Sequence, residues 1–310
     1  MSRNVLILDP LTLIGRELLA CLEDRASGLA LTFAHTAIDD EHQIADLAGQ
    51  AGLVPPLDDL SALDRADLVV VTSDQESDRL RAVGRWVADH PGARVVDLGR
   101  TATLRRVTRP WCAGPPPADA TKFRIAHPAV AAAGRLAVAL ESLGVTAGHL
   151  IAVDPTSHRG RDPVEVLARQ GRARLQGQSV TETIDGHVLA FGYIAIDADE
   201  LQDEADVALG PGWTTDHALV GCFHGHVAHV VIDLERAIDE NTFRDLMTTD
   251  DDLEVHPRPL ALDTVPDADR VFVATPRIAS DGRRVGTVMM MDGLRFGGAV
   301  TGAELIDRLS

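Results

Sequence analysis

Short apolar runs of strand length alternate with helical patterns over the first 125 residues, and this alternation constrains the fold more than any other feature. The apolar runs are Asn4–Leu8, Leu29–Ala34, Ala66–Thr72 and Ala93–Leu98. Apolar residues recur at helical spacing from Arg16 to Leu22 and from Asp78 to His90, where Pro91-Gly92 ends the pattern. Strands that alternate with helices predict an α/β, Rossmann-like doubly wound parallel sheet with right-handed crossovers.

The first strand, turn and helix have the order of a nucleotide-binding unit, but the turn lacks most of the expected glycines. A working turn needs glycines so that backbone N–H groups can approach a pyrophosphate. Of these only Gly15 is present, at the position where glycine serves helix–strand packing, and it is the one candidate cofactor-binding residue. Asp9 places a carboxylate where phosphate oxygens would lie, and Pro10 removes a donor. We therefore expect no bound cofactor.

The second half of the chain has a different pattern. We expect strands at 150–153, 187–196, 217–234, 270–278 and 285–291, helices at 163–177, 241–247 and from 299 to 309, and a Pro-rich loop at 108–119. Long strands with few crossover helices predict an α+β unit with a mixed or antiparallel sheet.

A Pro-containing turn and an Ala-rich helix, Phe123–Leu140, join the two halves. A helix N-terminus lowers the pKa of a thiol, so such a turn is a natural place for a nucleophile. Here it carries Ala129, Val130 and Ala131, none of which can attack a carbonyl.

Composition excludes several classes of protein. The 310 residues carry a formal charge of −18, which opposes binding to nucleic acid or anionic membranes. The chain contains no apolar run of the ~18 residues that span a membrane, and Asn4–Leu8 follows so soon after Met1 that we expect no signal peptide. Its three cysteines have no regular spacing, which favours a reducing cytoplasm over a disulfide framework.

Several segments resemble the aspartate-semialdehyde dehydrogenase family. The closing stretch DGLRFGGAVTGAELID (292–307) resembles the family's D-N-L-R-K-G signature, and 159–170 resembles its S-G-A-G-x-x-G-V-E-E-L segment. Residues 189–197 resemble L-A-F-N-V-I-P, and 222–235 resemble the strand that carries the catalytic histidine. The resemblance implies a Rossmann-like domain (1–127 and 292–310), a dimerisation domain (128–291), a last helix that returns to the first domain, and a homodimer.

The family oxidises its aldehyde through a Cys thiolate, with a His that moves the proton, NADP that takes the hydride, and phosphate that releases the acyl group. When these roles are carried over to this sequence, the Cys position falls near Val130 and the substrate Arg position falls on Leu219. The stretch after the second strand ends in Asp39-Asp40, where a 2′-phosphate would need Arg or Ser. Only the catalytic His persists, as His226. The closing R-F-G-G is similar to the degenerate Usg-type paralogues, which also lack the cysteine.

The resemblance therefore implies a dehydrogenase-like protein without dehydrogenase activity, acting as a dimeric binding or structural protein, with a protein partner as a further possibility. The alternative is an enzyme of altered chemistry that uses His226. A nucleotide sensor without catalysis is a third reading.

Cys222, His224 and His226 alternate within the expected strand 217–234, so their side chains would share one face. Two such histidines and a thiol can chelate zinc. The alternative is that they are ordinary half-buried sheet residues, and we expect no metal site because no further Cys/His pair completes the set. Along a strand, Cys222 would lie about 13 Å from His226, too far for a hydrogen bond. Cys112 cannot be placed from its sequence context.

Overall fold

A computed structural model divides the chain into two compact units, residues 1–125 with 298–310, and 126–297. The structure describes residues 3–25, 28–37, 42–47, 50–99, 101–112, 115–258, 260 and 269–309. Asp39 and Asp40, singled out in the sequence, lie outside these residues.

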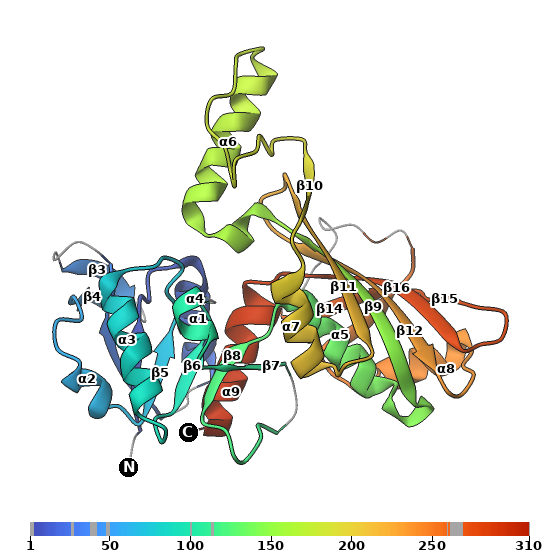
Figure 1. The fold of residues 1–310 in the computed structure, drawn as a ribbon, viewed down its shortest axis with the longest axis horizontal. Coiled ribbons are helices and arrows are strands. Elements are labelled where there is room, and N and C mark those ends of the chain that lie inside the picture. The colour runs from blue at the N-terminus through green and yellow to red at the C-terminus, as the bar shows by residue number, and fades with distance from the viewer. Residues whose placement is uncertain are drawn as a thin grey trace. The chain divides into compact units, whose positions relative to one another are not determined.

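The first unit is built on a six-stranded sheet of order β2-β1-β5-β6-β8-β7, and every pair in it is parallel (Figure 1). Its strands are β1 (Asn4–Leu8), β2 (Ala30–Ala34), β5 (Leu68–Val71), β6 (Val95–Asp97), β7 (Arg109–Trp111) and β8 (Lys122–Ile125). Its helices are α1 (Leu13–Asp24), α2 (Ser61–Asp64), α3 (Asp78–Asp89), α4 (Ala102–Arg105) and α9 (Thr301–Leu309), and β3 (Gln43–Leu47) with β4 (Gln50–Val54) forms a separate hairpin.

Both faces of this sheet are covered, because its strands are apolar on both sides. Val5 and Ile7 belong to one core cluster and Leu6 and Leu8 to another. The first cluster also contains Leu305 and other α9 residues. The doubly wound fold and the return of the last helix to the first unit, both predicted, are confirmed.

The second unit contains an eight-stranded mixed sheet of order β10-β11-β9-β12-β16-β14-β13, with β15 paired to β16. Its strands are β9 (Val145–Asp154), β10 (Tyr193–Ile196), β11 (Trp213–Val220), β12 (His226–Leu234), β13 (Leu253–His256), β14 (Val271–Ala274), β15 (Arg277–Ile278) and β16 (Arg284–Met291). Its helices are α5 (Pro128–Ala139), α6 (Arg161–Leu175), α7 (Asp199–Ala208) and α8 (Glu240–Met247), with short 3₁₀ helices η1 (Glu141–Leu143) and η2 (Thr156–Arg159), and a π-helical turn, η4 (Arg295–Val300), leads into α9.

Helices α5 and α7 pack on one face of this sheet (Figure 1). Along β9 and β12 the residues that face them, such as Ala152 and Ala228, are buried, and their neighbours Val153 and Val227 on the other face are half-exposed. This alternation is typical of a sheet with only one covered face.

Three predicted strands and one predicted loop differ from the structure, and of these residues 270–278 form β14 and β15 rather than one strand. Residues 217–234 form two strands, because Gly225 adopts a positive φ of 91° and the chain between β11 and β12 leaves the extended conformation. Of 187–196, only Tyr193–Ile196 is a strand, after a turn in which Phe191 has a φ of 60°. The Pro-rich loop 108–119 contains β7, where Pro110 is tolerated because β7 is an edge strand.

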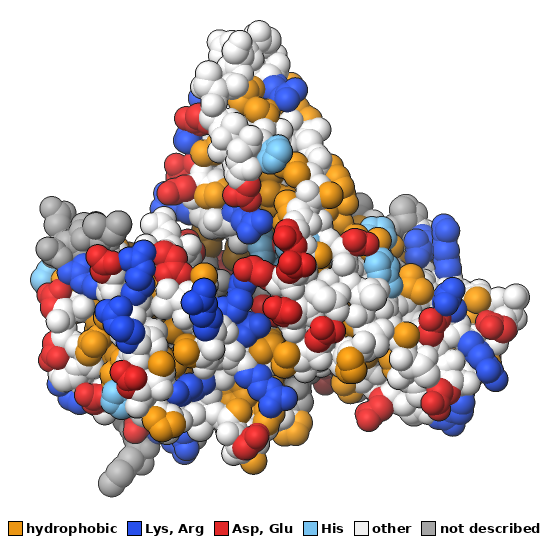
Figure 2. Space-filling model, viewed as in Figure 1, with side chains coloured by type: hydrophobic (Ala, Val, Ile, Leu, Met, Phe, Trp, Pro, Cys, Tyr) orange, Lys and Arg blue, Asp and Glu red, His pale blue; other side chains and the backbone are white. Residues whose placement is uncertain are grey.

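Among the described residues, no helix is long and apolar enough to cross a membrane. Figure 2 shows Asp and Glu side chains interspersed with Lys and Arg side chains over the visible face.

Candidate functional site

Asp154, the last residue of β9, is the centre of a buried polar cluster in the second unit. Its residue exposure is 1%. In the sheet register, Asp154 pairs with Leu219 of β11, and Val153 pairs with Val227 of β12. His226, the first residue of β12, is therefore placed beside Asp154 by strand pairing.

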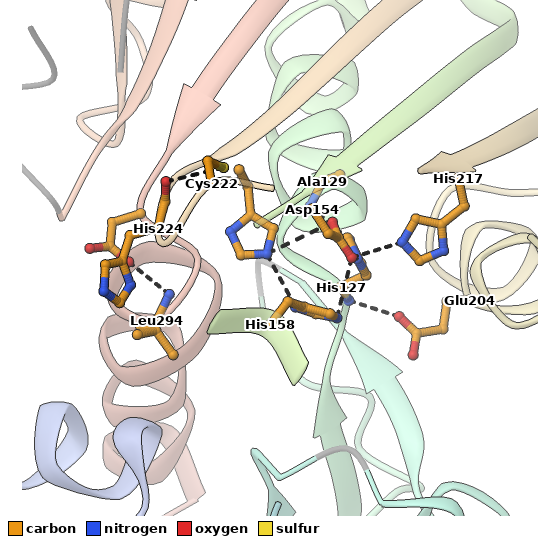
Figure 3. Close-up of polar contacts among 11 residues, drawn as sticks. His127, Ala129, Asp154, His158, Glu204, His217, Cys222, His224 and Leu294 are labelled. Carbon is orange, nitrogen blue, oxygen red and sulfur yellow. Dashed lines mark hydrogen bonds and ion pairs between the residues drawn. The ribbon is translucent and has the colours of Figure 1, made fainter. Parts of the chain in front are cut away.

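Four imidazoles surround the Asp154 carboxylate (Figure 3). Oδ2 accepts hydrogen bonds from Nε2 of His127 at 3.0 Å and Nε2 of His217 at 2.7 Å. Nε2 of His158 lies 3.5 Å from the same oxygen. Nε2 of His226 lies 3.8 Å from Oδ1 and 3.1 Å from Nδ1 of His158. These side chains come from the N-terminus of α5, from β11, from η2 and from β12.

His127 is fixed at three points. Its backbone N–H donates to Oε2 of the buried Glu204 on α7 at 2.7 Å, and its Nδ1 accepts from the Ala129 N–H at 3.1 Å, which caps α5. Pro128 occupies the first helical position, where its missing N–H costs nothing. Because Nδ1 is an acceptor, the neutral ring carries its proton on Nε2 and donates it to Asp154.

Imidazoles favour the ionised form of the Asp154 carboxyl group. Burial raises its pKa, but the imidazoles of His127 and His158 and the hydrogen bonds from His127 and His217 outweigh burial and hold the pKa well below its usual value. Among the described residues every ion pair of Asp154 is with a histidine. No arginine or lysine of the described chain forms an ion pair with Asp154.

The ring of His226 is packed tightly against the backbone of Gly293. A Cβ added at Gly293 would lie 2.2 Å from both Nδ1 and Cε1 of His226, and 2.8 Å from Cγ of Pro128. Only glycine leaves room for the imidazole in this position. His226 is buried, with a residue exposure of 2%.

The predicted common face of Cys222, His224 and His226 on one strand does not form. Cys222 and His224 lie in the connection before β12, not on the strand, and the Cys222 thiol donates to the His224 carbonyl oxygen at 3.7 Å (Figure 3). Burial raises the pKa of Cys222, which makes its thiol a poorer nucleophile. Val130 and Leu219 are fully buried.

In the turn at Gly15 of the first unit, the backbone packs closely and the Asp9 side chain is hydrogen-bonded to neighbouring residues. A Cβ at Gly15 would lie 2.7 Å from the Pro10 carbonyl oxygen, so this glycine allows close helix–turn packing. The Asp9 carboxylate accepts hydrogen bonds from the Thr36 N–H at 2.7 Å, from the Thr36 hydroxyl at 2.6 Å, and from the Ser73 hydroxyl.

Sequence reasoning identified His226 but missed the other members of its cluster. These are His127, Asp154, His158, Glu204 and His217. One signal was available for His127: a residue before a Pro that opens an Ala-rich helix is an N-cap, and its side chain lies at the helix mouth. The rest are brought together by strand register, which no local pattern reveals.

No family model matches the chain, and no curated protein matches it. Solved structures do match over nearly the whole chain. A probable aspartate-semialdehyde dehydrogenase from Pseudomonas aeruginosa superposes with a TM-score of 0.81 at 19% identity, covering 99% of this chain and 98% of that one. Aspartate semialdehyde dehydrogenase II from Vibrio cholerae, complexed with ASA, gives 0.82 at 17% identity, covering 100% and 98%. Aspartate semialdehyde dehydrogenase from Francisella tularensis gives 0.77 at 12% identity, covering 99% of each chain. At these identities the comparison shows the fold.

Proposed function

We propose that this chain is a member of the aspartate-semialdehyde dehydrogenase family, similar to the degenerate Usg-type paralogues, that does not oxidise an aldehyde through a thioester. It acts in the cytoplasm as a homodimeric binding or structural protein. Residues 1–127 with 292–310 serve as its Rossmann-like domain and 128–291 as its dimerisation domain.

The groups that the His226 imidazole contacts support this proposal most directly. The imidazole that would serve a thiolate is instead 3.1 Å from a second imidazole and 3.8 Å from a carboxylate. The start of α5 offers buried Ala129, Val130 and Ala131. Cys222 is the single cysteine between residues 126 and 297, and its raised pKa argues against a thiolate at neutral pH.

The test is an assay of the purified protein with aspartate semialdehyde, NADP and phosphate, followed as NADPH absorbance. We expect no NADPH above the rate without protein, beside a family enzyme that is active under the same conditions. Turnover that disappears in Cys222→Ser would overturn the proposal, because it would identify a working thiol.

We further propose that the turn at residues 9–15 binds no dinucleotide. The Asp9 carboxylate is held in the turn by Thr36 and Ser73, where it repels phosphate oxygens. Calorimetry with NAD and with NADP should record no saturable heat. Saturable binding of either nucleotide, lost in Gly15→Val, would contradict this and support a nucleotide sensor.

The open face of the large sheet supports the homodimer. Ile151, exposed His229 and Val288 are cross-strand neighbours on β9, β12 and β16, and the two apolar residues are half-exposed. A sheet with a half-exposed apolar face gains stability when a second copy covers it.

A second candidate is an enzyme of altered chemistry in which His226 is the base. The observation that favours it is the hydrogen-bonded chain from His226 through His158, whose side chain is 17% exposed and therefore reaches solvent. Such a base would exchange the α-proton of a carbonyl compound with D₂O, measurable by NMR. Exchange lost in His226→Gln and kept in His224→Gln supports this candidate, and absence of exchange with aspartate semialdehyde counts against it.

A further inference from the structure

We infer that the Asp154 cluster is a binding site for one divalent first-row transition-metal ion of the zinc type, held by Oδ1 of Asp154, Nε2 of His226 and Nδ1 of His158. This departs from the sequence-based expectation of no metal. It does not rest on the proposed function, because metal binding is measured without a substrate.

The two oxygens of Asp154 have different roles. Oδ2 accepts from Nε2 of His127 and of His217, at 3.0 and 2.7 Å. Oδ1 is buried and accepts no hydrogen bond from the described residues. The two imidazoles therefore orient the carboxylate so that Oδ1 is left facing His226, as the hydrogen-bonded carboxylate ligands of metal sites are oriented.

The remaining donors have the separation that a metal ion requires. Nε2 of His226 lies 3.1 Å from Nδ1 of His158 and 3.8 Å from Oδ1 of Asp154. Ligand bonds of 2.0–2.1 Å in a tetrahedral site place neighbouring ligand atoms about 3.4 Å apart. These two separations lie on either side of that value, and each of the three side chains offers a ligand atom within 4.8 Å of the other two, so small ring rotations would bring the three side chains to one ion.

The alternative group of His127, Asp154 and His217 also lies within ligand reach of one ion. His127 is a poor ligand there, because binding through Nε2 requires a proton on Nδ1. That proton would point at the Ala129 N–H, which now donates to Nδ1. His127 and His217 therefore remain hydrogen-bond donors to the carboxylate.

Charge and access both favour a cation. Asp154 is 1% exposed, and its ion pairs within the described chain are all with imidazoles. A divalent ion would supply a positive charge that compensates the buried carboxylate. Two imidazoles and one carboxylate suit Zn²⁺ or Fe²⁺ and leave a coordination position open. The 17% exposure of the His158 side chain provides a route for the ion.

The experiment is calorimetric titration of the EDTA-stripped, dialysed protein with Zn²⁺, with elemental analysis after gel filtration. We expect one ion per chain. Co²⁺ should give the intense visible absorption of a four-coordinate site. His217→Ala removes a hydrogen-bond partner of the ligand Asp154 and should weaken Zn²⁺ binding about 10–100-fold. His226→Ala and His158→Ala each remove a ligand and should weaken Zn²⁺ binding by more than that.

His224→Ala is the matched control, because it removes an exposed histidine two residues from His226. It should retain one tightly bound ion. The inference would be overturned if the stripped wild-type protein failed to bind Zn²⁺ or Co²⁺. It would also be overturned by unchanged affinity in His158→Ala, or by loss of the ion in His224→Ala. His158 lies on a half-exposed 3₁₀ helix, so its variant keeps the test valid if His226→Ala does not fold.

Discussion

Asp154 holds together side chains that are far apart in the sequence. His127 precedes it by 27 residues and His217 follows it by 63, and both donate to the same oxygen. A carboxylate with two such donors is favoured in its ionised form even when buried, since hydrogen bonds to a charged group are stronger than neutral ones. The geometry of the cluster therefore depends on this one residue.

Asp154→Asn should lower the free energy of unfolding by about 3 kcal/mol, because the amide loses a charged acceptor and turns an N–H toward an imidazole donor. Urea denaturation of the metal-free protein measures this. Asp216→Asn on the adjacent strand is the control, since its side chain is 71% exposed, and we expect a change within about 0.5 kcal/mol. Equal stability of the two variants would show that Asp154 is not the centre of the cluster.

Gly293→Ala should displace the His226 ring, because the new Cβ would lie 2.2 Å from two ring atoms. Overpacking of this kind costs about 1–3 kcal/mol, and we expect weaker Zn²⁺ binding as well. Gly171→Ala, on α6 with nothing within 4 Å of its Cβ, should instead be neutral or stabilising by up to about 1 kcal/mol. Thermal melts that rank the two variants in the opposite order would contradict the close packing of the His226 ring against Gly293.

At the scale of elements, the connection between β11 and β12 determines where Cys222 lies and how far its thiol is buried. Gly225 takes a positive φ there, and a Cβ at Gly221 would lie 2.2 Å from the Leu189 carbonyl oxygen. The connection removes Cys222 from the strand that His226 begins and half-buries its thiol.

Because burial raises the pKa of Cys222, the folded protein has less thiolate than the unfolded chain at any pH below that raised value. Iodoacetamide should therefore modify Cys222 more slowly in the native protein than in urea at pH 8, and the native rate should rise about tenfold per pH unit in this range. Mass spectrometry of the Cys222 peptide follows this. Native alkylation faster than the urea control would indicate an activated thiol.

Elements with strong local periodicity were predictable from the sequence. Residues 5–8 and the strand Leu68–Val71 are apolar throughout because both sheet faces are covered, and α3 shows clear helical spacing before Pro91. Helix α7 was missed because half of its residues are acidic and its buried positions, such as Glu204, are not all apolar.

The candidate site was predictable only at His226. Resemblance identified that residue, and the alternation of Cys222 and His224 with it suggested one strand where the chain makes two. Strand register, the cap of α5 and the turn of η2 assemble the remaining side chains. These are long-range contacts, and no period in the sequence encodes them.

For the whole molecule, we expect two copies of the 33.1 kDa chain to associate through the open face of the large sheet. Val288→Arg should produce a monomer, because a charge in an apolar interface is costly to desolvate. Light scattering after gel filtration measures the mass. Val138→Arg, at a residue 62% exposed on α5, should remain a dimer. A dimer in Val288→Arg, or a monomeric wild-type protein, would contradict this interface.

We expect the metal-binding centre of this fold to consist of a carboxylate and imidazoles, without a thiol. X-ray absorption at the zinc edge of the Zn²⁺-loaded protein in solution tests it most directly, because nitrogen and oxygen ligands at about 2.0–2.1 Å are distinct from sulfur at about 2.3 Å. We expect a coordination shell of nitrogen and oxygen with imidazole scattering. A sulfur ligand in that shell would contradict it, since Cys222 would then belong to the site.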